Sequence, residues 1–438
     1  MRCNATPFET MRGTVANTVV SLTSSSAARR QGRIRSRGST GIRTRCSSSS
    51  ARSAFDSLPI LTLPDQQPQE EQAFASKLRH ACHNVGFFYV RNHGVSARTY
   101  ADALHSSKTF FALDYEQKMT IDYRQSPAFR GYMAQGLENT AGRPDRREQI
   151  EFGVDPPTSE ISATTSSSPS TVRPYYKRLV AHPNQWPDQH VPTLRPHVQQ
   201  FMKEMEVLSR RLMTYLAMSL DLPANYFDDT FGTCPNVQLK ICHYPAVANA
   251  DHNNEDVSND DKARAMFGVG PHTDSGYLSL LLQDNVGGLQ VQNGEGRWID
   301  APPIDGTIVV NLGEMIQLAT QGYFLATPHR VLNVERQQED SGRFSMPYFW
   351  SPHLDFCVRR IELPKSLLWE RPKPSTQTIE STDSHDGGNK LHACYGENAF
   401  KSLARSHPQV MERHHPDLAV LPDGTIAEKN VECLELSS

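Results

Sequence analysis

The chain has 438 residues, of which 37% are hydrophobic and 21% charged, a composition typical of a soluble globular protein with a sizeable core. No stretch reaches the roughly 18 to 20 consecutive apolar residues that a membrane-spanning helix needs, so we expect no membrane span. The eight cysteines are scattered and include no CxxC pair, which argues against a disulfide framework or a thiolate zinc site and indicates a reduced compartment. Any metal should therefore be held by histidines and carboxylates.

Residues 1–55 differ in composition from the rest of the chain. They hold ten arginines, no lysine and one acid, Glu9, with serine runs that cannot bury enough apolar surface to fold. This pattern is typical of an organelle transit peptide. The alternative is a disordered tail that carries no targeting signal. We expect an intracellular protein. It should lie in a plastid or mitochondrion if the leader is a targeting signal, and in the cytoplasm otherwise. The leader contributes +9 to a total of −3, and the acidic remainder, near −12, argues against nucleic-acid binding.

The first ordered elements are predicted from hydrophobic periodicity. Residues 58–63 are typical of a short edge strand, and residues 86–90 of a second strand. Ser96 is a candidate N-cap for the second of three expected helices. These helices are predicted at residues 70–84, 96–113 and 196–220.

The second half of the chain has a different texture. From residue 237 to about 355, short alternating or apolar runs are separated by Gly and Pro, which predicts an antiparallel sandwich or barrel. The expected strands lie at residues 237–243, 278–282, 289–292, 307–312 and 343–350. Three polar, aperiodic segments are predicted to be surface insertions: residues 157–171, 248–261 and 375–389.

A candidate metal site begins with His272 and Asp274. Residues two apart in an extended chain point to the same face, so one strand end can offer both ligands. His329 follows 55 residues after Asp274, far enough for a sheet to return and add a third ligand. Two imidazoles and one carboxylate leave three open positions on an octahedral ion, the arrangement of non-haem iron(II) oxygenases.

The His-x-Asp spacing alone is weak, because it occurs three times in a chain with 17 histidines. His353 with Asp355 and His415 with Asp417 share it, but neither pair is followed by Arg-x-Ser. After His329, by contrast, come Arg343 and Ser345, again at same-face strand spacing.

The Arg343 and Ser345 pair indicates a carboxylate site. Arginine presents a planar fork that matches a carboxylate, and serine adds a hydroxyl donor. Such a pair can hold the distal carboxylate of 2-oxoglutarate while the other end of that molecule chelates iron, and Tyr244 can add a third donor. For a lone arginine, a surface ion pair would be the ordinary interpretation.

The chain resembles the isopenicillin N synthase-like superfamily of 2-oxoglutarate- and iron(II)-dependent dioxygenases over nearly everything after the leader. The matching motifs are Gly86-Phe87-Phe88, Asn92-His93-Gly94-Val95, Arg130-Gly131-Tyr132, Tyr244-Pro245, His272-Thr273-Asp274, Asn311-Leu312-Gly313, His329-Arg330-Val331 and Arg343-Phe344-Ser345. Two positions depart from the family pattern. Cys242 stands where the family often has asparagine, and Glu314 stands where it often has aspartate.

The resemblance implies a mainly β fold, a double-stranded β-helix (jelly-roll) core flanked by helices. It assigns His272, Asp274 and His329 to iron, and Arg343, Ser345 and Tyr244 to 2-oxoglutarate. The expected regions are a leader at 1–55, an amino-terminal region at 56–175, a helical linker at 176–235, the jelly roll at 236–356 and a C-terminal extension on the core at 357–438.

The expected reaction is the hydroxylation or desaturation of a small organic molecule with release of succinate and CO2. It requires Fe(II), 2-oxoglutarate and O2, with ascorbate as a candidate reductant. Two alternatives stay open from the residues: a non-haem iron oxidase that uses no 2-oxoglutarate, and a catalytically silent jelly roll that binds a small molecule. The expected partner is the substrate alone, with the protein a monomer.

Several further residues invite a functional interpretation. His93 lies in a motif that the family uses structurally, so we expect no catalytic role. A second group falls where family members line the substrate cavity, although an aromatic side chain there is more often core: Phe129, Glu151, Phe152, Phe231 and Phe349.

Overall fold

The computed structural model describes residues 54–65, 67–140, 143–156, 172–246, 267–333, 342–368 and 392–429. The predicted leader, except its last two residues, and the three predicted insertions lie outside these ranges. All of the described residues belong to one compact unit by their contacts. The region boundaries predicted above stay predictions. Buried side chains from Leu61 to Ile426 share one hydrophobic cluster that crosses the boundaries at 175/176, 235/236 and 356/357.

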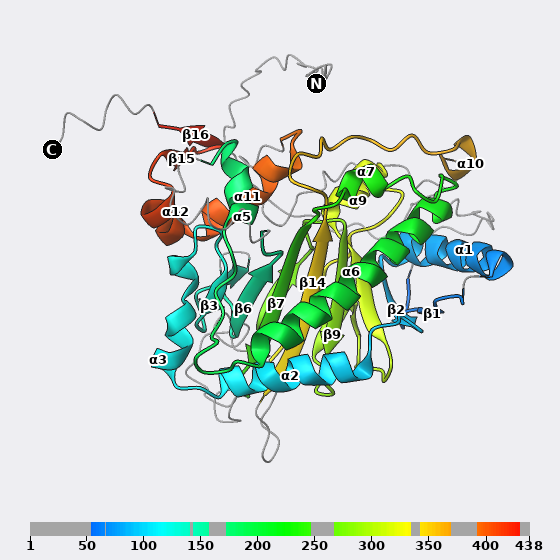
Figure 1. Cartoon of the computed structure of the whole chain (residues 1–438). Coiled ribbons are helices and arrows are strands. Elements are labelled where there is room, and N and C mark those ends of the chain that lie inside the picture. Colours follow the sequence, from blue (N-terminus) through cyan, green and yellow to red (C-terminus); the bar gives the residue numbers. More distant parts are fainter. Residues whose placement is uncertain are drawn as a thin grey trace, which may run out of the picture. The chain divides into compact units, whose positions relative to one another are not determined.

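Two sheets form the centre of the fold (Figure 1). The larger sheet has the strand order β1-β2-β12-β9-β14-β7-β6-β3, and the smaller has the order β11-β10-β13-β8. All neighbours pair antiparallel except β1 and β2, which are parallel. The predicted jelly-roll core with flanking helices is confirmed, and β1 lies at the sheet edge as predicted.

The strands of the larger sheet are β1 (Ile60–Thr62), β2 (Phe87–Arg91), β3 (Gly131–Met133), β6 (Glu148–Gly153), β7 (Asn236–Tyr244), β9 (Leu278–Gln283), β12 (Ile308–Leu312) and β14 (Arg343–Ser351). Those of the smaller sheet are β8 (Phe267–His272), β10 (Leu289–Gln292), β11 (Trp298–Asp300) and β13 (His329–Leu332). Two further pairs are β4 (Asn139–Thr140) with β5 (Arg143–Pro144), and β15 (Leu418–Val420) with β16 (Ile426–Glu428).

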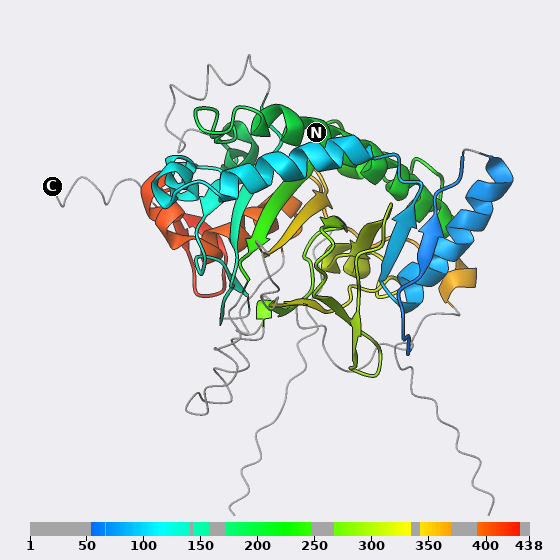
Figure 2. The same ribbon diagram turned by 90° about the horizontal axis from the view of Figure 1, so that it is seen from below.

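Three long helices, α1 (Pro68–Asn84), α2 (Ala97–Phe111) and α6 (Leu194–Ser219), lie together on one face of the larger sheet (Figures 1 and 2). The Ser96 hydroxyl accepts a bond from the Thr99 amide, so the predicted N-cap of α2 is confirmed. The shorter helices are α3 (Tyr115–Lys118), α5 (Arg178–Ala181), α7 (Asp228–Phe231), α9 (Glu314–Ala319), α10 (Lys365–Leu368), α11 (Tyr395–Ser406) and α12 (Pro408–His414), with 3-10 turns at Met119–Ile121, Tyr123–Gln125 and Tyr175–Lys177. None of the helices in these ranges is both long and apolar enough to cross a membrane.

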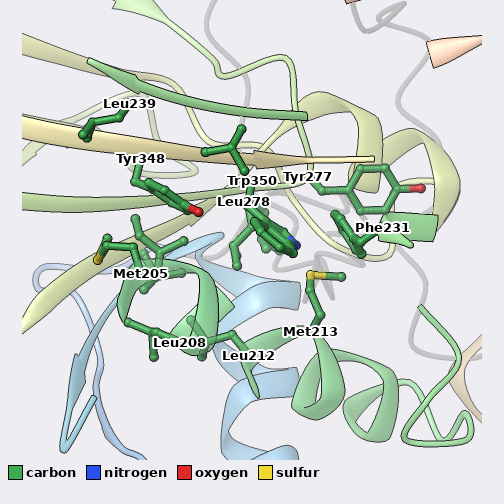
Figure 3. Packing of buried hydrophobic residues seen from close by; sticks show 14 of the residues in the cluster. Met205, Leu208, Leu212, Met213, Phe231, Leu239, Tyr277, Leu278, Tyr348 and Trp350 are labelled. Carbon is green, nitrogen blue, oxygen red and sulfur yellow. The ribbon is translucent and has the colours of Figure 1, made fainter. Parts of the chain in front are cut away.

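Helix α6 packs on the sheet through the apolar side chains that repeat every three or four residues. Figure 3 shows Met205, Leu208 and Leu212 on the helix that runs beside Tyr348 and Trp350 of β14, and all five belong to one hydrophobic cluster. All five are at most 1% exposed. Tyr348 and Trp350 are on the side of β14 that faces the helices. The alternate residues of the strand therefore face the other way, into the space between the two sheets.

Candidate metal centre and substrate cavity

The three predicted metal ligands converge at one end of the smaller sheet. His272 ends β8 and His329 begins β13, and the two are direct partners in the β8 to β13 ladder. Their Nε2 atoms lie 3.8 and 3.7 Å from Oδ1 of Asp274. In the described part of the chain this is the one group of three or more His, Cys, Asp or Glu side chains able to share a metal ion.

Both imidazoles are oriented by a hydrogen bond to the backbone carbonyl two residues earlier in the chain. Nδ1 of His272 bonds to the Gly270 carbonyl at 2.9 Å, and Nδ1 of His329 bonds to the Thr327 carbonyl at 3.2 Å. A carbonyl accepts, so Nδ1 carries the proton and the Nε2 lone pairs face Asp274, as metal ligation requires. Burial and the neighbouring His329 lower the pKa of His272 to about 3, which keeps that ring neutral. The donor set therefore fits a divalent transition metal such as Fe(II).

Asp274 is held by two contacts, one from the end of β12 and one from the start of α9. Asn311 of β12 donates from Nδ2 to Asp274 Oδ2 at 2.7 Å, and the Glu314 amide donates to the Asp274 carbonyl at 2.7 Å. Burial alone would raise the pKa of Asp274, but the two imidazoles and the Asn311 bond lower it. A Cβ on Gly313 would lie 2.2 Å from the Gly276 carbonyl oxygen, so only glycine allows this close approach.

The Asn311 contact gives a first prediction. Leucine branches at Cγ as asparagine does but cannot donate, so N311L should leave one carboxylate oxygen of Asp274 without its partner. We expect iron(II) affinity to fall by roughly 10- to 100-fold, the usual cost of losing such a supporting bond. Titration of the folded apoprotein with Fe(II) measures this, with N285L as a distant asparagine control. An affinity equal to that of the wild type would contradict the proposed role of Asn311.

The predicted carboxylate site lies deeper between the sheets. Arg343 is fully buried, and its guanidinium carbon lies 4.9 Å from the ring centroid of Tyr244, its cross-strand partner. Its Nη2 donates to Gln283 Oε1 at 3.1 Å, whereas Nε and Nη1 have no hydrogen-bond partner among the described residues. Ser345, two residues on, is also buried. A buried guanidinium with donors left over can bind an anionic group such as a carboxylate.

A polar cavity of about 270 Å³ opens beside the metal ligands. Two neighbouring strands, β7 and β14, line it with alternate residues. The cross-strand pairs Glu151 with Lys240 and Gly153 with Gln238 place β6 and β7 side chains in register. The described lining residues outside the metal ligands include Glu138, Arg147, Asn236, Gln238, Lys240, Phe349, Ser351, Tyr395, Ser402 and His407.

The cavity wall carries charges that are paired with one another. Lys240 Nζ lies 2.9 Å from Glu151 and 3.3 Å from Glu138. Burial alone would raise the pKa of Glu138, but Lys240 and Arg147 lower it to about 2. Burial opposes the charge on Lys240, yet the two carboxylates raise its pKa overall. The side chains of the wall are therefore charged, but their positive and negative charges balance one another.

The C-terminal region supplies the other side of the cavity. Helix α11 contributes Tyr395, Ser402 and Leu403, and the Tyr395 hydroxyl accepts from Asn236 Nδ2 at 3.0 Å. A smaller cavity of about 110 Å³, which includes Glu151, adjoins it and shares Tyr395, Ser402 and Leu403. This region was expected only to pack on the core, and its place at the site is not evident from the sequence.

The other sequence candidates fall in different places. Glu151 and Phe349 line the two cavities, whereas Phe129, Phe152 and Phe231 belong to the hydrophobic core. His93 lies in a separate cavity of about 350 Å³ that contains no metal ligand, and its Nδ1 accepts from the Val95 amide. His415 and Asp417 bond to Arg178, and Asp355 pairs with Lys177. The two other His-x-Asp sequences are thus used away from the metal ligands.

Comparison with known proteins agrees with this geometry. Residues 58–189 match the model of the non-haem dioxygenase in morphine synthesis N-terminal family, and residues 235–352 match that of the 2OG-Fe(II) oxygenase superfamily. The 2-oxoglutarate-dependent dioxygenase frbJ of Dothideomycetidae sp. (strain 11243) is 37% identical over 82% of this chain and 92% of its own. The chain belongs to the 2OG-Fe(II) oxygenase superfamily. It is a 2-oxoglutarate-dependent dioxygenase that requires Fe(II), with 2-oxoglutarate and O2 as co-substrates.

Further relatives of the dioxygenase differ in their names. A probable iron/ascorbate oxidoreductase of Dictyostelium discoideum is 32% identical over 81% of this chain and 96% of its own, and ascorbate as a reductant fits that name. Homoarginine-6-hydroxylase 2-ODD-C23 of Glycine max is 31% identical over 71% and 88%. Among solved structures, a full-length Neurospora crassa protein in complex with alpha-KG and thymine has a TM-score of 0.61 and 25% identity, covering 81% of this chain and 99% of that one.

Proposed function

We propose that the dioxygenase hydroxylates a small polar molecule held between the metal ligands and the charged wall of β6 and β7. His272, Asp274 and His329 would hold iron(II), which supplies the chemistry of dioxygen activation. Arg343, with Ser345 and Tyr244, would bind the distal carboxylate of 2-oxoglutarate.

The observation that carries the 2-oxoglutarate assignment is the pair of buried guanidinium donors on Arg343. A buried donor without a partner costs free energy, so it marks a place where a ligand completes the bonding. Gln283 fixes the guanidinium by accepting from Nη2 and donating from Nε2 to the Ala301 carbonyl at 3.1 Å. This arrangement favours the 2-oxoglutarate reaction over an oxidase that does not use it.

Anaerobic reconstitution tests this proposal. The folded protein, iron(II) and 2-oxoglutarate together should give a weak visible charge-transfer band, and admission of oxygen should then give succinate. R343A should lose the band at 2-oxoglutarate concentrations that saturate the wild type, with affinity reduced by roughly 100-fold or more, because the buried positive charge that would face the carboxylate is removed.

The control for this experiment is R146A, which removes an arginine that does not line the metal cavity. It should keep the band and the succinate yield. A band of wild-type strength in R343A, or no band in folded and iron-loaded wild type, would contradict the assignment and favour the oxidase.

The substrate proposal depends on the polarity of the cavity. Ligand cavities are usually lined mainly by apolar and aromatic groups, whereas this one has Val269, Phe349 and Leu403 among mostly polar or charged side chains. The named relatives include a hydroxylase of homoarginine and a structure with bound thymine, both of which are small polar molecules. A panel of amino acids, nucleobases and apolar terpenoids, scored by stimulated succinate release, tests the proposal. Stimulation by apolar compounds alone would contradict it.

We also propose that residues 1–55 direct the dioxygenase to an organelle, and that it acts as a monomer without nucleic acid. The arginine-rich, acid-poor composition of the leader supports the first point. A fluorescent fusion with and without residues 1–55 tests the address, and light scattering at working concentration tests the monomer. Identical distribution of the two fusions, or a dimer mass, would contradict these points.

A further inference from the structure

Two cysteines face each other at the base of α11. Cys357 lies six residues after β14 and Cys394 directly precedes α11, and the two form an isolated antiparallel bridge. The flanking backbone bonds run from the Val358 amide to the Ala393 carbonyl at 2.7 Å and from the Tyr395 amide to the Phe356 carbonyl at 2.9 Å. This pattern makes the cysteines a non-hydrogen-bonded pair, in which opposed side chains point to the same side of the bridge. The Cys394 thiol donates to the Leu354 carbonyl at 3.2 Å and would turn from it to reach Cys357.

The spacing of such a pair suits a disulfide. Opposed Cα atoms in a non-hydrogen-bonded pair are about 4.5 Å apart, within the range of roughly 4.4 to 6.8 Å found across disulfides. The neighbouring backbone is closely packed, because a Cβ on Gly396 would lie 2.6 Å from the Leu354 carbonyl oxygen. The Gly396 amide donates to that same carbonyl at 2.9 Å. The two segments are therefore already held in register without a covalent link.

The two thiols also differ from two of the other described cysteines in their access to solvent. Cys357 is exposed and Cys394 is half-buried, whereas Cys82 and Cys242 are buried. Burial raises the pKa of the Cys82 and Cys242 thiols, which leaves them poor nucleophiles. Cys234 is exposed but forms no bridge with another described cysteine.

We propose that Cys357 and Cys394 form a reversible thiol oxidation site whose oxidant is a small disulfide such as oxidised glutathione. The Cys357 thiolate attacks one sulfur of glutathione disulfide and releases one reduced glutathione. The Cys394 thiolate then attacks the Cys357 sulfur of the mixed disulfide, forms the Cys357 to Cys394 bond and releases the second glutathione. Two electrons and two protons pass from the protein thiols to the two glutathione molecules.

The bond would connect α11, which forms part of the cavity wall, to the segment that follows β14. Tyr395, which follows Cys394, and Ser402 and Leu403 on the same helix line the cavity beside the metal ligands. A covalent link at the start of α11 fixes these side chains relative to the segment after β14. The metal ligands lie on β8, β13 and the Asp274 loop, so iron and 2-oxoglutarate binding should not change.

Peptide mapping of the full-length protein tests the proposal. After incubation in buffers of increasing oxidised to reduced glutathione ratio, remaining thiols are alkylated and the protein is digested without reduction. We expect a linked pair of peptides containing Cys357 and Cys394, which dithiothreitol removes. The link should be absent in C357S and C394S and present in C234S, which replaces the exposed cysteine away from the bridge.

The melting temperature gives a second readout. Oxidised wild type and oxidised C234S should melt about 3 to 5 °C above their reduced forms, because the cross-link restricts the unfolded chain. Cysteines that stay fully alkylated, or that end as separate glutathione adducts under oxidising conditions, would overturn the proposal. A linked pair with an unchanged melting temperature would overturn the inference that the bond fixes α11. Mapping of the wild type decides the question even if a serine variant folds poorly.

Discussion

Replacing Asp274 by alanine should abolish turnover of the dioxygenase. The variant removes the only carboxylate of the three converging ligands and leaves His272 and His329, whose Nε2 atoms both face Oδ1 of Asp274 at 3.7 to 3.8 Å. Because the reaction depends on the bound ion, we expect succinate formation to fall by roughly three orders of magnitude or more, together with a loss of tight iron(II) binding.

The matched control for D274A is D355A. Asp355 belongs to another His-x-Asp sequence, but it pairs with Lys177 and Tyr176 and lines neither the metal cavity nor its neighbour. Iron content of the purified proteins and succinate yield are measured for both variants. Full iron loading with normal succinate in D274A, or an equal loss in D355A, would contradict the assignment of Asp274 to the metal.

The metal ligands could be predicted from the sequence because they depend on local geometry. His272 and Asp274 are two residues apart, and His329 opens a strand that pairs with the strand ending at His272. Arg343 and Ser345 follow the same rule of strand alternation. Arg343 and Ser345 lie on one strand, whereas Asp274 lies just beyond the end of β8. The spacing still brought each pair together, so only the meeting of the strands had to be inferred.

The same alternation could have located part of the cavity wall. Counting back from Tyr244 in steps of two gives Cys242, Lys240, Gln238 and Asn236, and the last three line the cavity. The signal was present, but a charged residue such as Lys240 in a predicted strand is more often solvent-exposed. Its burial became evident only from its pairing with Glu138 and Glu151.

The contribution of α11 could not be predicted. Tyr395, Ser402 and Leu403 reach the cavity through contacts more than 100 residues away in sequence, such as the Asn236 bond to Tyr395. An amphipathic helix predicts a buried face, but not which surface that face covers. The relevant information lies in long-range packing against the segment after β14.

The stability of the dioxygenase should fall in mild acid through His415. Its ring accepts at Nδ1 from Arg178 Nη1 at 3.1 Å and donates from Nε2 to the Pro127 carbonyl at 2.9 Å, so the neutral form is the one that fits. Burial, opposed by the Pro127 bond and aided by Arg178, lowers the pKa of His415 from 6.5 to about 4. The unfolded chain therefore takes up a proton below pH 6.5 that the folded chain takes up only near pH 4.

This difference gives a defined pH window. The stabilisation is complete above pH 6.5 and is lost progressively as the pH falls toward 4, with a total of about 3 kcal/mol. In H415Q the glutamine amide can accept from Arg178 and donate to Pro127 without titrating, so the acid loss should shrink by up to that amount. Urea unfolding between pH 7.5 and 4 measures it, with the exposed His80 replaced in H80Q as the control. Equal pH dependence in wild type and H415Q would exclude His415 as the cause, because the remaining buried histidines are unchanged in both proteins.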